Sequence, residues 1–398
     1  MKRVKFFSGN YAKARGGVKA NRFVGRKCGV SVALEKGKLT AALVTAARQV
    51  GAAAKSELLD LISVQEDLKL FDASSLASLA VFTGVSYERL ADWLIGRGRA
   101  VGAEQAVKDL VRYLEQKEVP VHVVAPLGGV LVEEAIELAA GITLLPLNRV
   151  PESQSKAQFL ERIRWPGLQV LWRFSSGYSA LICPRFRDKG HPEGESWVLL
   201  DPPELSEIER QVVDVCRILT IVGPCAPICL GLWEQTEDWV PCGDGLYLDK
   251  WFWTWRDAEV PHAWRKLDAE ELAQAKDLFG CYLGLADEVR RAIRVPLDRL
   301  NDSIRRRNLE DAAIDLGISL EALFGGPGRD RRASEFLRGR PDERDGIKKS
   351  VRDIYSLRSR AVHGGRVNGG EAKQVLKSGW EVVAEALRKT ILLGKLPE

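Results

Sequence analysis

The chain has no long apolar run, although it is 398 residues long and 45% hydrophobic. No segment approaches the roughly 20 apolar residues that span a bilayer. The basic first eight residues are not followed by the apolar core of a secretory signal peptide. These absences predict a cytoplasmic protein that has no membrane partner.

Cysteine is scarce and irregularly placed. The seven cysteines are an odd number scattered over a large chain, which predicts reduced thiols rather than a disulfide framework. Cys225, Cys229 and Cys242 are spaced too loosely for a zinc site and have no evident fourth ligand. Gly16 and Gly17 lack the Lys-Ser/Thr pair of a phosphate-binding loop. We therefore expect no metal and no cofactor.

Charge is plentiful but unevenly distributed. Residues 1–38 hold 11 Lys or Arg and one Glu, a net charge of +10, and residues 290–398 hold 24 Lys or Arg and 16 Asp or Glu, a net charge of +8. Because the whole chain carries +5, the middle carries −13. Basic ends on an acidic body favour a polyanionic partner, most often a nucleic acid. The alternative is that the basic surfaces keep the protein soluble or pair with its own acidic middle.

The length allows two or three domains, and the residue patterns predict an α+β multidomain protein. Residues 1–38 form a basic arm with interspersed aromatic rings, which either follows a phosphate backbone or is mobile. Residues 39–118 have helical periodicity. Residues 119–264 contain short β-type runs, and residues 265–398 return to helical periodicity. We expect a helical N-terminal region, a β-rich middle domain and a C-terminal antiparallel helical bundle.

Residues 79–97 resemble the helix-turn-helix of phage-repressor-type DNA-binding proteins. Gly84 is placed at the tight turn, and Ser86 is placed to cap the second helix. That helix has apolar residues on one side and Glu88 and Asp92 on the other. Because these carboxylates would face phosphates, a helix pair used for packing or for a partner contact is an equal alternative to DNA binding.

The middle region, residues 119–264, combines short strands with most of the tryptophan. Nine of the eleven Trp residues lie between Trp165 and Trp264. They either line a ligand surface or, as is commoner for Trp, pack in a core. One helix is expected to start at a capping box formed by Ser206 and Glu209. The expected strands are residues 119–125, 141–147, 168–174, 179–183, 196–200, 228–233 and 251–255.

Several local signals divide the C-terminal region into helices. Asp268 and Asn308 are placed as N-terminal caps, and Pro296 is expected to interrupt or restart a helix. Residues 325–346 are rich in Gly, Arg and Pro. They predict a long cationic loop that either gathers RNA or is disordered and unimportant. A last helix, over about residues 371–393, closes the bundle.

Arg358 and His363 lie near the end of one of these helical patterns, which Gly364 and Gly365 are expected to terminate. A guanidinium suits a phosphate, and an imidazole at the negative end of a helix dipole is suited to donate a proton near neutral pH. Together they supply the groups that cleavage of RNA requires. The alternative is a surface ion pair for Arg358 and a helix cap for His363.

Residues 300–324, the Gly/Arg-rich segment after them and the helix of Arg358 and His363 together resemble the HEPN superfamily, in particular its prokaryotic Apea-like branch. The resemblance covers about the last third of the chain. Many HEPN proteins are metal-independent ribonucleases in which an Arg and a His, separated by a few variable residues, meet at a composite site between two protomers. The resemblance therefore implies a HEPN-like helical bundle, a homodimer, RNA as substrate, and Arg358 and His363 as catalytic residues. The polar residue that often follows the Arg in this family is matched only loosely by Ser359.

Other side chains are candidates to support this site. They are Tyr355, Ser359, Arg360, Asp315 and Glu321. The two carboxylates are placed to orient Arg358 unless they lie on a solvated helix face. Contacts to RNA are expected from Arg305, Arg306, Arg307, Arg331 and Arg332.

Two hypotheses of function follow. The resemblance implies an endoribonuclease that cleaves RNA through attack by the 2′-hydroxyl, as a toxin or an antiviral defence effector, with the acidic, Trp-rich middle domain as a sensor of a regulatory ligand. The second hypothesis is a non-catalytic regulator that binds nucleic acid, including DNA, through the basic arm and the helix after Ser86, and that uses the bundle only to dimerise. Salt-sensitive binding without cleavage would support the second hypothesis.

Overall fold

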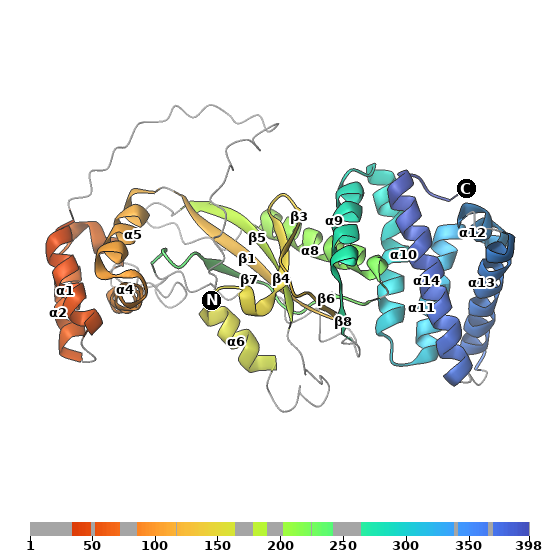
Figure 1. The fold of residues 1–398 in the computed structure, drawn as a ribbon, viewed down its shortest axis with the longest axis horizontal. Coiled ribbons are helices and arrows are strands. Elements are labelled where there is room, and N and C mark those ends of the chain that lie inside the picture. The colour runs from red at the N-terminus through yellow and green to blue at the C-terminus, as the bar shows by residue number, and fades with distance from the viewer. Residues whose placement is uncertain are drawn as a thin grey trace.

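The computed structural model describes ten segments of the chain: residues 34–48, 52–71, 86–116, 118–163, 178–188, 202–223, 225–241, 264–337, 341–364 and 369–397. The helices within residues 36–115 lie at one end, a sheet lies in the middle, and the helices within residues 269–393 lie at the other end (Figure 1). The predicted mixture of helices and strands is confirmed. None of the helices in these segments is long and apolar enough to cross a membrane.

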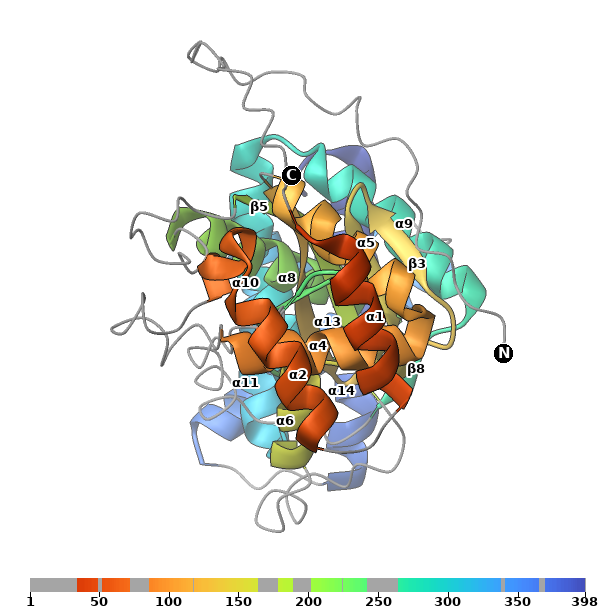
Figure 2. The same cartoon turned by 90° about the vertical axis from the view of Figure 1, so that its left-hand side faces the viewer.

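The N-terminal helices pack around a core of their own. They are α1 (Lys36–Arg48), α2 (Ala52–Ser63), α4 (Tyr87–Val101) and α5 (Ala103–Glu115), with the short 3-10 helix η2 (Glu66–Phe71). Figure 2 views the molecule from this end. Leu43, Leu58, Leu94 and Leu110 are fully buried in this core, to which Trp239 also contributes. The cluster accounts for the helical periodicity of residues 39–118.

The second half of the expected helix-turn-helix is helix α4. The Ser86 hydroxyl accepts a hydrogen bond from the Arg89 backbone N–H at 3.2 Å, so the predicted cap is confirmed. Glu88 and Asp92 are exposed as expected, and Asp92 forms an ion pair of 2.5 Å with Lys55 of α2. The first half of the motif, residues 79–85, lies outside the described residues. The basic arm also lies outside them, apart from residues 34–38.

The sheet is antiparallel and is built on a long central strand. Its strands are β1 (Glu118–Gly128), β3 (Ile136–Ala139), β4 (Ile142–Pro146), β5 (Ser179–Asp188), β6 (Ile228–Cys229) and β7 (Trp233–Thr236). Their order is β3-β4-β5-β1-β6, and β7 also pairs with β1. A separate parallel pair joins β2 (Val130–Leu131) to β8 (Arg265–Lys266).

The strand predictions are confirmed for three of the four segments that the structure describes, whereas the strand expected at residues 228–233 is interrupted at residues 230–232. The strands expected at residues 119–125, 141–147, 179–183 and 228–233 correspond to β1, β4, β5 and the β6–β7 segment. The strands expected at residues 168–174, 196–200 and 251–255 lie outside the described residues. Trp233 and Trp239 are buried, which agrees with core packing for these two tryptophans.

Within the described residues the sheet is accompanied by helices α6 (Gln154–Ile163) and α8 (Pro202–Val222) and by the 3-10 turn η4 (Leu147–Arg149). Helix α8 begins at Pro202, so the start expected at Ser206 is wrong by one turn. Proline is well tolerated in the first turn of a helix because its missing N–H has no intrahelical partner there. The earlier start therefore follows from a proline signal that competes with the capping box.

The C-terminal bundle consists of α9 (Ala269–Leu283), α10 (Asp287–Arg305), α11 (Leu309–Phe324), α12 (Arg329–Leu337), α13 (Pro341–Val362) and α14 (Gly369–Leu393). Asp268 caps α9 in a full capping box with Glu271, and Asn308 caps α11 through the backbone N–H groups of Glu310 and Asp311. These predicted caps and the last helix are confirmed.

Two expectations for this region are wrong. Pro296 does not interrupt a helix, because it is buried inside α10. The interruption in helical structure comes earlier, at residues 284–286 between α9 and α10. Packing of the buried ring offsets the roughly 3 kcal/mol that an interior proline costs. Residues 325–346 are not one long loop, because α12 and the first residues of α13 occupy most of this range. Helix α12 has an inward face, on which Ala333 is fully buried.

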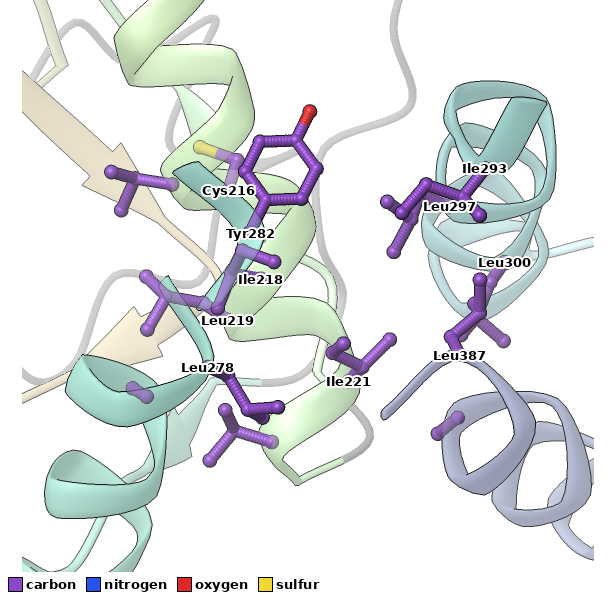
Figure 3. Packing of buried hydrophobic residues seen from close by; sticks show 14 of the residues in the cluster. Cys216, Ile218, Leu219, Ile221, Leu278, Tyr282, Ile293, Leu297, Leu300 and Leu387 are labelled. Atoms are coloured by element: carbon purple, nitrogen blue, oxygen red, sulfur yellow. The ribbon is translucent and has the colours of Figure 1, made fainter. Parts of the chain in front are cut away.

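The sheet and the bundle share one continuous hydrophobic core. It runs from β1 and β5 through α8 and α9 to α10, α11, α13 and α14. Figure 3 shows Ile221 of α8 facing Leu387 of α14, and Leu278 and Tyr282 of α9 belong to the same core. The boundary expected between residues 264 and 265 therefore does not coincide with a break in the core.

A polar network also links α8 to the bundle. Arg217 of α8 donates two hydrogen bonds to Asp298 of α10, at 2.7 and 2.8 Å, and a third to Asp214 at 2.6 Å. The Tyr282 hydroxyl of α9 donates to Asp214 at 2.9 Å. Burial raises the pKa of Tyr282 to about 12, with the Asp214 carboxylate adding to the effect. The phenol therefore stays a hydrogen-bond donor across the physiological range.

His122 gives the first testable prediction, which concerns stability and pH. Its side chain in β1 is 15% exposed, and its Nε2 lies 3.9 Å from an Oε1 atom of Glu237. Burial lowers the pKa of His122 by more than Glu237 raises it. Because the unfolded chain takes up a proton below about pH 6.5 while the folded chain resists it, stability is complete above that pH and falls as pH decreases toward the folded pKa.

We expect the melting temperature of the parent protein to fall more steeply between pH 7.5 and pH 5.5 than that of His122→Gln. Thermal denaturation at a series of pH values measures this difference, and comparison with the variant removes the contribution of the carboxylates that both proteins share. Parallel curves for the two proteins would contradict the assignment.

Candidate functional site

Arg358 and His363 lie at the C-terminal end of α13. The helix ends at Val362, and the His363 backbone N–H still donates to the Ser359 carbonyl oxygen at 3.1 Å. Helical geometry therefore extends to His363. Gly364 then adopts a left-handed conformation with φ +71°, as the predicted stop requires, whereas Gly365 lies outside the described residues.

Arg358 faces α11. Its Nη1 donates to Oε2 of Glu321 at 3.0 Å, and its guanidinium lies 5.7 Å from the centre of the Tyr355 ring. Its side chain is 27% exposed, so it remains accessible from solvent. The predicted contact between Glu321 and Arg358 is confirmed. An arginine held in this way has little rotamer freedom left to lose when it binds an anion.

Tyr355 completes this face of α13. Its hydroxyl donates to the Gly317 carbonyl oxygen at 3.0 Å, and the Arg329 guanidinium stacks on its ring at 3.7 Å. Burial raises the pKa of Tyr355. Two guanidinium groups, those of Arg329 and Arg358, therefore lie around one aromatic ring beside α11.

Gly317 allows Arg358 to lie against α11. A Cβ atom at position 317 would come within 2.4 Å of the Arg358 Cδ atom. At position 346 of α13, by contrast, a Cβ atom would meet nothing within 4 Å. The two glycines therefore form a matched pair, one in close contact and one in open space.

A double-mutant cycle tests this contact. Gly346→Ala should stabilise the protein by about 0.5–1 kcal/mol because alanine favours helix over glycine. Gly317→Ala should lose that gain in the parent, because Arg358 must leave Glu321, and should recover it in an Arg358→Ala background. Chemical denaturation measures the four free energies of unfolding. An equal effect of Gly317→Ala in both backgrounds would contradict the packing described.

His363 lies on a different face of α13 from Arg358. Each residue of an α-helix turns by about 100°, so His363 is about 140° around the helix from Arg358 but only about 60° from Arg360. The imidazole is exposed. The structure therefore does not bring Arg358 and His363 together on one face of a single chain, and His363 instead continues the stripe formed by Lys349, Ser356 and Arg360.

That stripe forms one wall of a cavity between α13 and α14. The cavity has a volume of about 340 Å³. It is lined by Lys349, Ser350, Asp353, Ser356, Arg360, Glu371, Gln374, Val375 and Ser378. The Ser350 and Ser378 hydroxyls lie 2.7 Å apart and join its two walls. Arg360 lies 3.6 Å from Glu371, and its buried Nε atom has no hydrogen-bond partner in the part of the chain that the structure describes.

The remaining predicted site residues are Asp315 and the arginines expected to bind RNA. Asp315 is 4% exposed and binds Arg299 at 2.8 Å and Arg306 at 2.9 Å. The expectation that it orients Arg358 is therefore wrong. Two arginines from the α10 side outcompete the more distant Arg358 because short charge-assisted hydrogen bonds are the strongest available to a buried carboxylate.

The predicted RNA-binding arginines are partly engaged within the chain. Arg305 bonds to Asn301 and Asp302, and Arg332 donates to the Phe324 and Gly326 carbonyl oxygens. The exposed members of the set are Arg307 and Arg331, and Arg331 lies 3.7 Å from Glu335. Ser359 is exposed as well. Contact of these residues with RNA stays a prediction.

Sequence reasoning missed Gly317, Arg329 and the cavity. The stripe of Lys349, Asp353, Ser356, Arg360 and His363 has helical spacing, but a solvated face has the same pattern. Its opposite wall comes from α14, and only the tertiary structure pairs the two helices. Asp353 and Glu371 give the cavity as many carboxylates as cationic groups.

Within the described segments, no group of three or more His, Cys, Asp or Glu residues is arranged to hold a metal ion. The Cys225 and Cys229 thiols donate to the carbonyl oxygens of Leu219 and Gly231, and burial raises the pKa of each to about 12. Both thiols therefore stay protonated hydrogen-bond donors near neutral pH. Cys242 lies outside the described residues.

Comparison with known proteins adds no relative: no family model, no curated protein sequence and no solved structure matches the chain. The resemblance of residues 300–324, the Gly/Arg-rich segment and the helix of Arg358 and His363 to the HEPN superfamily therefore stays a prediction.

Proposed function

We propose that the protein is a metal-independent endoribonuclease that acts as a homodimer. The observation that carries the proposal is the end of α13, where a partly exposed, pre-positioned Arg358 is followed five residues later by an exposed imidazole at the helix terminus. A fixed cation and a titratable base within one short segment are the two groups that cleavage of a phosphodiester requires in the absence of a metal.

The reaction starts with attack of an RNA 2′-hydroxyl on the adjacent phosphorus atom. His363 transfers a proton, either from the attacking hydroxyl or to the leaving 5′-oxygen. Arg358 donates hydrogen bonds to the phosphorane oxygens as their negative charge grows. The P–O5′ bond breaks, and the products are a 2′,3′-cyclic phosphate and a 5′-hydroxyl. Without a 2′-hydroxyl, DNA provides no nucleophile.

The positions of the two side chains support the proposed dimer. Arg358 faces α11 and His363 lies about 140° further around α13, so neither completes the site of its own chain. A twofold axis near the end of α13 would bring Arg358 of one copy to His363 of the other. Val362, which is 58% exposed between them, provides apolar surface for such a contact.

Glu321 holds the Arg358 guanidinium in an ion pair before RNA binds. Its carboxylate occupies the guanidinium edge that a phosphate would use. Because this ion pair is partly exposed, it contributes little to stability and a phosphate can replace it at small cost. In the defence or toxin role that we propose, the region of residues 119–264 would act as the sensor, and the shared core offers a physical connection from β1 to α13.

Incubation of purified protein with single-stranded RNA in EDTA tests the proposal. We expect cleavage of RNA but not of DNA of the same sequence, and products that end in a 2′,3′-cyclic phosphate. Cleavage that requires a divalent cation, or 3′-hydroxyl products, would contradict it. Salt-sensitive binding of nucleic acid with no cleavage at any protein concentration would instead favour a non-catalytic regulator.

A further inference from the structure

The cavity between α13 and α14 is lined by both cationic and anionic side chains. Lys349 and Arg360 provide cationic donors, whereas Asp353 and Glu371 provide carboxylate acceptors. A simple anion would satisfy the cations but would be repelled by the carboxylates. The better match is a ligand that carries a phosphate for the cations and hydroxyl groups for the carboxylates.

Arg360 has capacity for such a ligand. Its buried Nε has no partner in the described chain, and its distance of 3.6 Å from Glu371 is longer than a hydrogen bond. A buried donor without an acceptor is destabilising, and a phosphate oxygen in the cavity would satisfy it. Because Glu371 lies beside Arg360, a ligand whose phosphate binds Arg360 could also donate a hydrogen bond from a neighbouring hydroxyl group to the Glu371 carboxylate.

The residues that line the cavity favour binding of a sugar phosphate over binding of a nucleobase. Among the nine described residues that line it, Val375 is the one apolar side chain and none is aromatic. Single-stranded bases are usually held by stacking on aromatic rings, so this lining offers a base little. The volume of about 340 Å³ is at the small end of the range for ligand sites, which suits a single small unit.

We propose that the α13–α14 cavity binds one ribose-phosphate unit of the RNA backbone, with Arg360 on the phosphate and one of the two carboxylates on the ribose 2′-hydroxyl. This inference rests on the proposed ribonuclease function. His363 lies about one turn beyond Arg360 on the same stripe of α13, so the bound unit would be adjacent to the group that moves the proton. Recognition would be of the backbone and of the 2′-hydroxyl rather than of base sequence.

Binding of ribose 5-phosphate to the full chain tests the inference without any cleavage. Ligand-observed NMR in EDTA should show binding that is tighter than that of 2-deoxyribose 5-phosphate or inorganic phosphate. Arg360→Gln should weaken it about tenfold, because a charge-assisted hydrogen bond is lost. Lys349→Gln should weaken it less, because Lys349 is already paired with Asp353 at 2.6 Å.

The control variant is Arg352→Gln, on the same helix, whose guanidinium binds Asp330 away from the cavity at 2.7 Å. It should leave binding unchanged. Equal binding of the three probes, or an Arg360→Gln variant that folds and binds like the parent, would overturn the inference. Binding of ribose 5-phosphate by a parent protein that cleaves no RNA would refute the proposed function but not the cavity; cleavage unaffected by Arg360→Gln, with no binding of the probe, would refute only the cavity.

Discussion

Replacement of Arg358 or of His363 by alanine should lower the rate of RNA cleavage by at least about 10²-fold. Arg358→Ala removes the cation that stabilises the phosphorane, and His363→Ala removes the proton-transfer group. The change Arg358→Ala removes a partly exposed ion pair with Glu321, and His363 is exposed. Neither substitution should therefore lower the free energy of unfolding by more than about 1 kcal/mol. Initial rates on a labelled RNA, together with thermal denaturation of each variant, measure both effects.

Arg352→Ala is the matched control for these variants. Arg352 is an exposed arginine on the same helix, one and a half turns earlier, and it binds Asp330 rather than Glu321. Its replacement should leave cleavage within about twofold of the parent rate. If all three variants lose activity equally, the loss reflects general weakening of RNA binding by a basic surface. If none does, the site lies elsewhere on the chain.

Asp315→Ala should have the largest effect on stability, a loss of about 2–4 kcal/mol. Asp315 of α11 binds Arg299 and Arg306 together, and its removal leaves both guanidinium groups without their acceptor. The expected loss is less than for a fully buried pair, because both arginines are about a third or more exposed and can regain water. Chemical denaturation gives the free energy of unfolding directly.

Asp311→Ala on the same helix is the control for Asp315→Ala. Asp311 is exposed in the first turn of α11, where a carboxylate interacts only with the helix dipole. Its replacement should cost no more than about 1 kcal/mol. An Asp315→Ala variant as stable as Asp311→Ala would show that the two ion pairs contribute nothing measurable.

Features encoded by neighbouring residues were predictable from the sequence. The caps at Ser86, Asp268 and Asn308 depend on a side chain within three residues of the backbone group that it satisfies. The stop at Gly364 depends on one residue that tolerates positive φ. The strands β1 and β5 are also visible as short β-type runs between Pro and Gly residues.

Features that depend on distant partners were not predictable. The turn-rich composition of residues 325–346 indicates a loop, but a buried face that includes Ala333 holds α12 in helical form against the core. The partners of Asp315 are Arg299 of α10 and Arg306 directly after that helix, and the wall opposite Arg360 belongs to α14. The resemblance names Arg358 and His363, but only the contact with Glu321 and the exposed end of α13 show that the two face different directions.

Mixing Arg358→Ala with His363→Ala tests the composite site most directly. If each site takes Arg358 from one chain and His363 from its partner, then half of the randomly assorted dimers are mixed and each contains one intact site. The mixture of two inactive proteins should therefore recover about a quarter of the parent rate. No recovery, with differently tagged subunits showing that mixed dimers have formed, would contradict a site shared between two chains.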